Sequence, residues 1–468
     1  ERTLAACLHL LNGNSDEQKI AGMLLSAKYL NPNEIQKSVS KEEHQRELET
    51  VFNAIGLPFL DKLLRTPVEE TYASSYCGVA LSFLLNVCDY PSIQTSIIQL
   101  IVPLLHILSD SKDVQQREDV IRVFLSLWNN QALHNVLCHK ATIISLIKSL
   151  GGLVNEVLVE LSVAQKKKES STASEKETLL SHFLLLLNPV LQSYQSDASL
   201  FSILSAITKL TCTIPATYMY SLLPSISSLL MHPSTASIVL SQESPSSRNS
   251  LFFHLHWLLS RCYVYKASAG DRIHMFELTW SVITCFGFQW LSASLNASVP
   301  DKERIEDAKL VFLLTKMSSI EIQVQLDFFY KDVVSTYEET GEKATKDKDQ
   351  TKTASSLHVL FVCLHIVCGV MKEVGESVDV NNAFSSFDYD QVVALSTAWA
   401  DTLRNVKEFV TLALAMTQTD IYKREYQRNE DFKVMNTALE YCVMFIDFCL
   451  REFPEEIDDD SLIESLME

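Results

Sequence analysis

The sequence predicts an all-α protein, and three observations support this fold class. Glycine and proline number only 11 and 12 among 468 residues, below their typical usage of about 7% and 5%, whereas all-β folds need a turn every ~8–12 residues. Apolar residues recur at i, i+3, i+4 and i+7 from the first residues onward. Residues that cap or stop helices separate these stripes at short intervals.

The first elements follow directly from this pattern. A stripe over residues 4–11 is interrupted at Gly13, and Ser15 is a suitable N-cap for a second helix that ends before Pro32. Gly56 then separates a third helix from a fourth, which Pro67 stops. After the first two helices, we expect further helices over residues 41–55, 57–64, 69–88, 92–109, 114–129, 131–139 and 141–150.

Amphipathic helices alternate with helices that are apolar on most sides along this region. Short connections between such helices are typical of α-solenoids, in which inner helices are buried and outer helices show one polar face. No strict internal repeat is visible in the sequence. We therefore predict an armadillo/HEAT-like right-handed superhelix of degenerate helical repeats.

Two polar segments divide the chain. Residues 166–177 are charged and serine-rich, and residues 337–356 hold almost no large apolar side chain, so both are predicted to be exposed loops. They separate N-terminal repeats (1–165), middle repeats (178–336) and C-terminal repeats (357–454), which we interpret as sections of one superhelix followed by an acidic tail (455–468).

One downstream segment conflicts with the helical pattern. Residues 320–328 alternate apolar and polar side chains with period two, which alone indicates a strand. An isolated strand would leave its backbone groups unpaired, and no second such run lies nearby. We expect a helix there, and two long helices within residues 389–453.

The net charge limits the classes of partner. The chain has 39 Lys and Arg against 58 Asp and Glu, a formal charge of −19, which disfavours binding to nucleic acid or to an anionic membrane surface. The 11 cysteines lie mostly in apolar runs, as expected for reduced thiols, and no secretory signal opens the sequence. We therefore expect a cytoplasmic protein.

Four stretches without charge raise the question of a membrane span. Prolines, histidines or serines interrupt each of the four, which favours helices packed on two sides over an integral membrane span. The stretches cover residues 90–109, 210–242, 278–300 and 353–371.

Motifs for chemistry are weak. Cys363-x-His365-x-x-Cys368 and His254-x-His256 have ligand types for a metal, but residues two apart on a helix point in different directions and the neighbours are apolar, so core packing is the favoured interpretation. Phosphate-binding, nucleophile-elbow and zinc-protease motifs do not occur. We predict no catalytic, cofactor-binding or metal-binding residues.

The acidic tail is the one surface feature that suggests a partner. Its carboxylates are interspersed with apolar side chains, so that a short amphipathic segment could dock on a basic, grooved protein. A solvated terminus is the alternative. The predicted partner-binding residues are Glu455, Glu456, Asp458, Asp459, Asp460, Leu462 and Ile463.

Extended stretches of the first ninety residues resemble the neurochondrin family. They are residues 4–8 (LAACL), 15–30 (SDEQKIAGMLLSAKYL), 51–66 (VFNAIGLPFLDKLLRT) and 78–81 (GVAL), with a further likeness at residues 320–326 (IEIQVQL). The resemblance implies an armadillo-like, cytosolic, non-enzymatic protein. In animals, family members are associated with neurite outgrowth, synaptic signalling and restraint of a calmodulin-dependent kinase, so kinase or receptor signalling components are the partners that the resemblance implies.

The function predicted from these observations is a protein-interaction scaffold or adaptor that binds along a superhelix face or through the acidic tail. A regulatory or assembly-chaperone subunit that cradles one obligate partner is the first alternative. A hydrolase with a site assembled from distant residues is the second.

Overall fold

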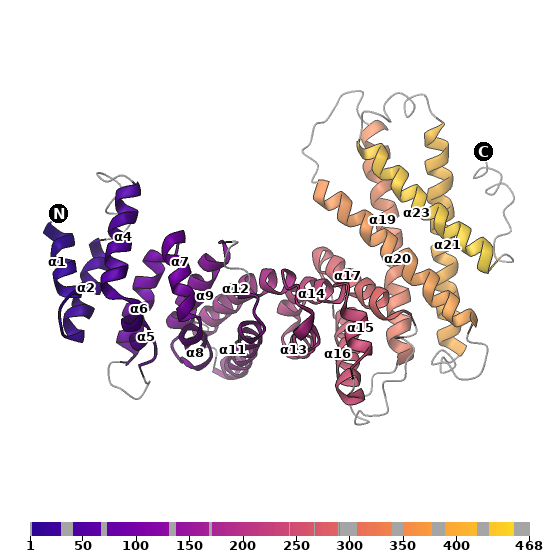
Figure 1. Cartoon of the computed structure of the whole chain (residues 1–468). Helices are drawn as coiled ribbons and strands as arrows, with labels where there is room; N and C mark the ends of the chain where they lie inside the picture. Colours follow the sequence, from indigo (N-terminus) through magenta and orange to yellow (C-terminus); the bar gives the residue numbers. More distant parts are fainter. Residues whose placement is uncertain are drawn as a thin grey trace. The chain divides into compact units, whose positions relative to one another are not determined.

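The computed structural model of the chain is helical and, within the residues it describes, contains no strand. Figure 1 shows this all-α architecture. The predicted fold class is therefore confirmed. The structure describes residues 2–29, 41–66, 73–130, 137–167, 171–242, 244–265, 267–288, 290, 307–338, 350–376, 389–418 and 430–453.

The chain forms two compact units that meet in sequence at Leu210 and Thr211. No sequence feature marks this boundary, which lies inside a helix within the predicted middle repeats. The helices of unit 1 are α1 (Arg2–Leu11), α2 (Asp16–Tyr29), α4 (Lys41–Ile55), α5 (Leu57–Leu64), α6 (Ala73–Val87), α7 (Pro91–Ile97), η1 (Ile98–Leu100), α8 (Ile101–Asp110), α9 (Val114–Trp128), α11 (Lys140–Lys167), α12 (Ser171–Gln192), η3 (Asp197–Ser199) and α13 (Leu200–Thr213), which crosses into unit 2.

Unit 1 is built from two rows of helices. In one row α6 contacts α2 and α9, and α9 contacts α12; in the other, α8 lies between α5 and α11. The rows join where α5 packs on α6, α8 on α9 and α11 on α12. Phe83, Phe124 and Phe183, one on each of α6, α9 and α12, are fully buried. Each buried ring of this size contributes about 1.5–3 kcal/mol, so the first row carries much of the core.

The pairing pattern is that of degenerate repeats. The equivalent helices α5, α8 and α11 begin at Leu57, Ile101 and Lys140, so their starts are 44 and 39 residues apart. Armadillo and HEAT repeats have periods of about 40–47 residues. The repeat arrangement is thus present in unit 1 without a consensus sequence, whereas the handedness of the predicted superhelix stays a prediction.

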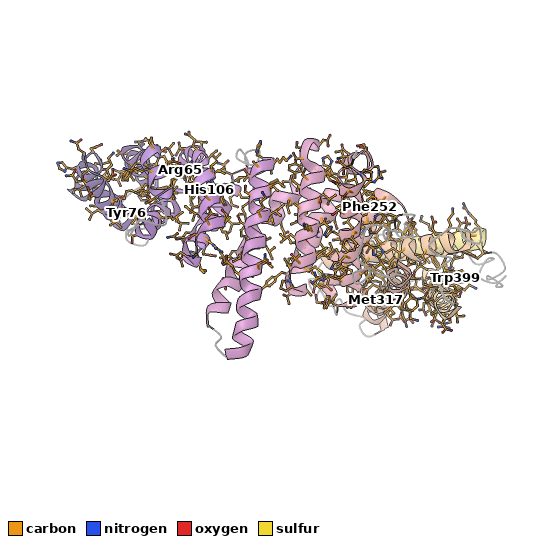
Figure 2. The ribbon with its side chains drawn as sticks, turned by 90° about the horizontal axis from the view of Figure 1, so that it is seen from below. Arg65, Tyr76, His106, Phe252, Met317 and Trp399 are labelled. Carbon is orange, nitrogen blue, oxygen red and sulfur yellow. The ribbon has the colours of Figure 1, made fainter. Side chains whose placement is uncertain are left out.

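Unit 2 also layers its helices in two rows. One row runs α14, α17, α20, α23 and the other α16, α19, α21, with α16 on α17, α19 on α20 and α21 on α23. Aromatic pairs join elements of this unit: Phe252 packs edge-on against Phe286 with ring centroids 5.0 Å apart, and Trp399 does so against Phe453 at 5.3 Å. Phe252 and Trp399 are labelled in Figure 2. The helices are α14 (Ala216–Leu230), α15 (Thr235–Leu240), α16 (Pro245–Val264), α17 (Ala269–Phe286), α19 (Asp307–Glu338), α20 (Gln350–Glu376), α21 (Tyr389–Thr417) and α23 (Glu430–Glu452).

Local chemistry explains several helix ends. Gly56 joins α4 to α5 with φ of 76°, a conformation that side-chain-bearing residues rarely adopt. The Asp113 carboxylate accepts hydrogen bonds from the backbone N–H groups of Gln115 and Gln116 and caps α9. Ser268 and Asp271 form a reciprocal capping box at the start of α17. These caps satisfy N–H groups that no helical carbonyl can reach.

The ambiguous segment 320–328 is helical, because it lies inside α19. Its isoleucines show how the alternating pattern is accommodated: Ile322 is fully buried, whereas Ile320 is 48% exposed. The expected pair of long helices within 389–453 is present as α21 and α23. Burial on one helical face thus overrides a period-two pattern that has no partner strand.

Three other expected elements differ in their bounds. The predicted loop 337–356 is helical at both ends, because α19 runs to Glu338 and α20 begins at Gln350. The predicted helix 92–109 is divided by the 3₁₀ turn η1, because the ring of Pro103 in the first turn of α8 prevents a continuous helix through the preceding carbonyls. Helix α11 runs to Lys167 and α12 begins at Ser171, so both ends of the charged segment 166–177 are helical. Lys and Glu, which are frequent there, favour helices. Division into sections at this segment stays a prediction.

Two segments, Pro91–Asp110 and Ala354–Glu373, are long and apolar enough to cross a membrane by length and composition alone. Half of the first and 44% of the second is buried inside the fold. Packing of α8 on α9, and of α20 on α19 and α23, covers the buried part of these segments. The absence of an integral membrane span stays a prediction.

Candidate protein-interaction groove

Helix α8 presents an aliphatic face that its neighbours do not fully cover. Its Leu104 and Leu108 are buried in unit 1. Leu105 faces a groove, which the buried Ile101 also lines one turn earlier, and Val102 beside them is 54% exposed. This face forms the apolar wall of the groove.

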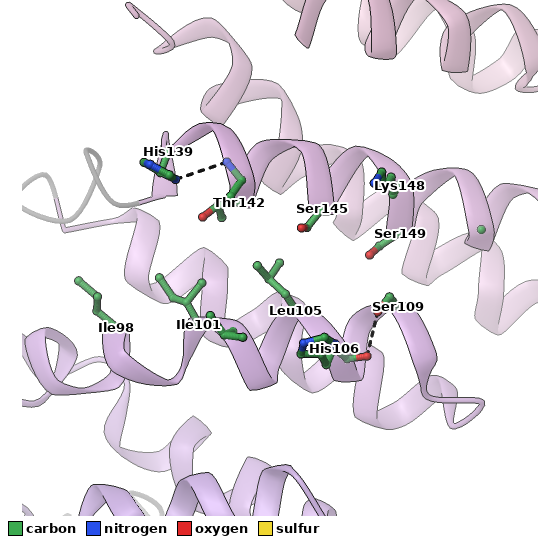
Figure 3. A pocket seen from close by; sticks show the side chains of 13 residues that line it. Ile98, Ile101, Leu105, His106, Ser109, His139, Thr142, Ser145, Lys148 and Ser149 are labelled. Atoms are coloured by element: carbon green, nitrogen blue, oxygen red, sulfur yellow. Dashed lines mark hydrogen bonds between the residues drawn. The ribbon is translucent and has the colours of Figure 1, made fainter. Parts of the chain in front are cut away.

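Helix α11 forms the opposite wall with hydroxyl groups. Ile143, Ile147 and Leu150 anchor the helix in the core. Ser145 and Ser149, four residues apart, face the groove, and Lys148 extends from the same wall into solvent. Figure 3 shows these side chains opposite Leu105 and His106 of α8.

The two walls enclose a cavity of about 530 Å³. The thirteen lining residues include one lysine, two histidines and no carboxylate. At one end of α8, Nδ1 of His106 lies 3.9 Å from a carboxylate oxygen of Asp110, which is outside the lining. The groove is therefore amphipathic and slightly cationic, in a chain that is strongly anionic overall.

Charged and polar side chains connect α9 to α11 and to α12. Both terminal nitrogens of Arg117, a buried residue on α9, donate to the Glu156 carboxylate of α11 at 3.0 Å. On the same helix, Glu118 accepts from Arg122 at 3.1 Å and lies 2.7 Å from Nδ1 of His182 on α12. The bidentate geometry of the Arg117–Glu156 pair adds specificity to the packing of α9 on α11.

Among the residues that line the groove, the Ser109 hydroxyl is not paired with a base that could activate it as a nucleophile. Ser109 donates its hydroxyl to the backbone carbonyl of His106 at 3.0 Å and not to the imidazole ring. A catalytic serine requires a base within hydrogen-bond reach of its hydroxyl. The geometry of Ser109, His106 and Asp110 thus suits recognition better than acyl transfer.

The structure separates the three residues of the cysteine–histidine motif. Cys363 is fully buried, and burial raises the pKa of its thiol well above the usual value while Glu321 on α19 raises it further. His365 and Cys368 line a different space, and burial raises the pKa of the Cys368 thiol and lowers that of the His365 imidazole. Cys363 is therefore a core residue, whereas His365 and Cys368 are half-buried, and the absence of a metal site at this motif stays a prediction.

That different space is a second cavity of about 280 Å³ between α20 and α23. Aromatic rings line it, among them Phe361 and Tyr441, whose centroids are 5.1 Å apart. Phe288 covers Gly369 so closely that an added Cβ there would come within 2.0 Å of the ring. Its lining includes Met444, which is 57% exposed, so this cavity lies at the surface beside the aromatic core.

The two histidines of the pair on α16, His254 and His256, also lie in different surroundings. Nδ1 of His254 lies 2.5 Å from the Ser250 carbonyl oxygen on its own helix. His256 is 2% exposed beside the Trp290 ring, and burial lowers its pKa to about 4, so it is neutral at pH 7. Within the described parts of both units, no group of three or more His, Cys, Asp or Glu side chains is placed to hold a metal ion.

The acidic tail lies outside the described residues, so the partner-binding role of Glu455 to Ile463 stays a prediction. The groove itself is a feature that the sequence analysis missed. Its one sequence signal is the row of hydroxyls at Thr142, Ser145 and Ser149, which recurs on one face of an otherwise apolar helix.

Comparison with known families bears on this fold. The profile of the neurochondrin family matches residues 1–423. The chain belongs to the neurochondrin family. The match includes both walls of the groove and every helix up to α21, whereas the acidic tail lies beyond it. The family resemblance seen in the first ninety residues is thereby confirmed and extended to most of this neurochondrin-family chain.

Solved structures give more distant likenesses. A structure of the TSC2 N-terminus is 11% identical, with 100% of this chain and 99% of that chain covered and a TM-score of 0.30. A crystal complex of SYS-1 and POP-1 is 10% identical, with 94% and 99% covered and a TM-score of 0.30. Neither likeness is strong enough to bear on function. None of the curated proteins matches the chain.

Proposed function

We propose that this neurochondrin-family chain is a non-enzymatic, cytoplasmic scaffold that binds protein partners, and that the groove between α8 and α11 is one of its contact surfaces. The observation that carries the proposal is the uncovered aliphatic face of α8, where Val102 is 54% exposed beside Leu105. Exposed apolar side chains in a concave, polar-rimmed surface are typical of interaction sites.

Family membership supports the scaffold, because a stack of helix pairs offers long surfaces for other proteins. Signalling kinases or receptors are the partner classes to test first, as the resemblance implies. The acidic tail is a second proposed contact. The groove supports binding more directly than hydrolysis, since Ser109 is tied to its own helix backbone.

The experiment places a photo-crosslinking amino acid at position 102 of the full chain and, as a matched control, at position 185. Leu185 is 62% exposed on α12, in the other row of unit 1, and does not line the groove. We expect adducts with the same cytosolic protein in repeated experiments from position 102 and not from position 185.

A charge placed in the groove provides the second arm. Val102→Glu should abolish the recovered partner, whereas Leu185→Glu should leave it bound. Identical adducts from both positions, or a partner that survives Val102→Glu, would show that the groove is not the contact surface.

A further inference from the structure

We infer that the α8–α11 groove recognises a peptide segment of a protein partner in which an acidic side chain lies next to a large aliphatic one. This inference rests on the proposed function and specifies its partner. The carboxylate is bound at Lys148 and Ser149, and the aliphatic side chain lies against Val102 and Leu105.

Charge complementarity is the first support. Asp and Glu make up 58 of the 468 residues, yet none lines the groove, whereas Lys148, His106 and His139 do. Within the described residues Lys148 forms no ion pair. An exposed ammonium in a concave site attracts anionic groups from solution.

An unpartnered hydroxyl is the second, independent support. Ser149 is 7% exposed, and its Oγ has no hydrogen-bond partner within the part of the chain that the structure describes. Among the described residues the hydroxyls of Thr208, Ser227 and Ser260 are also unpartnered, but none of them lines the groove. Ser149 instead points into the groove toward α8 (Figure 3). A ligand oxygen would satisfy a group whose isolation is otherwise unfavourable.

The single lysine among the lining residues indicates where the acidic group binds, because no arginine lines the groove. Lys148 and Ser149 are adjacent on the α11 wall, opposite His106 of α8. The partner's acid is therefore assigned to α11, which leaves the α8 wall for the aliphatic side chain.

The size and composition of the groove select the class of ligand. A volume of about 530 Å³ is that of a ligand pocket, ~300–1,000 Å³, and takes a short peptide segment. No arginine lines it, whereas phosphopeptides are usually bound by arginine clusters. A carboxylate needs only one cation and one or two donors, which the α11 wall supplies.

The test begins with a displayed library of random 12-residue peptides, selected on the full chain and counter-selected on the full chain carrying Val102→Glu. Peptides that survive should combine Asp or Glu with Leu, Ile, Val or Met at adjacent positions. Groove-dependent peptides that lack an acid would overturn this inference and leave the proposed function standing. If no selected peptide depends on Val102, both the inference and the assignment of the groove fail.

Affinities of one selected peptide then locate the acid. Lys148→Glu should weaken binding at least tenfold, and exchange of the peptide's acid for lysine should restore it. Lys140→Glu, on the same helix but outside the lining, should change affinity less than about twofold, because an exposed charge at that distance is screened by salt. If Lys140→Glu and Lys148→Glu weakened peptide binding equally, the loss of affinity would come from long-range charge alone. That result would overturn the assignment of the acid to Lys148.

Ser149→Ala gives a readout that a structural role would not. Loss of one hydrogen bond should weaken the peptide about fivefold, while the melting temperature of the free chain stays the same or rises, because the unpartnered hydroxyl is gone. A lower melting temperature with unchanged peptide affinity would make Ser149 a core residue. Sedimentation of the full chain completes the test: a dimer that Val102→Glu dissociates would make a second copy the occupant and overturn the proposal.

Discussion

The ion pair between Arg272 and Glu321 offers a sharp test of the packing in unit 2. Nε of Arg272 on α17 donates to the Glu321 carboxylate of α19 at 2.9 Å, and Gln325 donates to the other oxygen at 2.7 Å. The Glu321 side chain is 6% exposed and that of Arg272 is 29% exposed. Arg272→Met therefore leaves a buried carboxylate with one neutral donor.

Removal of one member of a buried pair costs about 3–5 kcal/mol, and the partial exposure of Arg272 places the expected cost near ~3 kcal/mol. Hydrogen exchange measured by mass spectrometry reports this locally, without an assumption about how the two units unfold. Because tenfold in an equilibrium constant corresponds to 1.4 kcal/mol, protection of the α17 and α19 amides should fall about 150-fold.

Two variants control the interpretation. The double variant Arg272→Met/Glu321→Gln removes the stranded charge and should recover most of the lost protection. Arg451→Met breaks an exposed pair with Asp447, whose side chains are 74% and 54% exposed, and should leave protection unchanged. Protection that falls equally in the single and double variants would refute the claim that the buried charge is what Arg272 compensates.

Three further outcomes follow from the structure. Asp113→Ala removes the cap of α9 and should lower the unfolding free energy by ~1 kcal/mol, measured by urea denaturation; Asp113→Asn should retain most of it, and equal losses in both would contradict a capping role. Burial lowers the pKa of His256 to about 4 from 6.5, so between these pH values the unfolded chain takes up a proton that the folded chain does not. The free energy of unfolding should therefore be greatest above pH 6.5 and fall as the pH drops toward 4, by about 2 kcal/mol between pH 7 and pH 5. An unchanged pH dependence in a His256→Phe chain would show that His256 is not the group responsible. Burial raises the pKa of Cys77 and Cys88 to about 11, so at pH 8 their thiolate fraction should be roughly a hundredfold below that of an ordinary thiol. A thiol reagent should modify both only after denaturant is added, which peptide mapping can detect. Rapid labelling of the native chain would show instead that the two thiols are accessible.

The helical character of this protein was available from the sequence because it depends on local signals. Scarce glycine and proline, the N-cap at Ser15 and the positive φ of Gly56 act within a few residues of where they stand. Even the alternating segment 320–328 could be assigned to a helix, since a strand would have needed a partner that the sequence does not provide. The family was recognisable for the same reason, from contiguous stretches.

The sequence did not reveal which helices lie side by side, and the groove depends on that. Leu105 and Lys148 belong to helices that follow a common amphipathic pattern, and nothing in either helix states that α8 and α11 are neighbours in one row. The same holds for Arg117 and Glu156, thirty-nine residues apart, whose pairing joins α9 to α11. Contacts of this kind depend on complementary side-chain shapes summed over the whole unit.

What the sequence alone determined is therefore the all-helical class, the acidic balance and the family. What only the tertiary structure decided is the meaning of individual polar residues. Cys363 and His365 have ligand chemistry in the sequence and prove to face different surroundings, while Ser149, one hydroxyl among many, stands unpartnered in a groove. The physical reason is that desolvation and hydrogen bonding depend on what surrounds a side chain in space, and distant parts of the chain supply those surroundings.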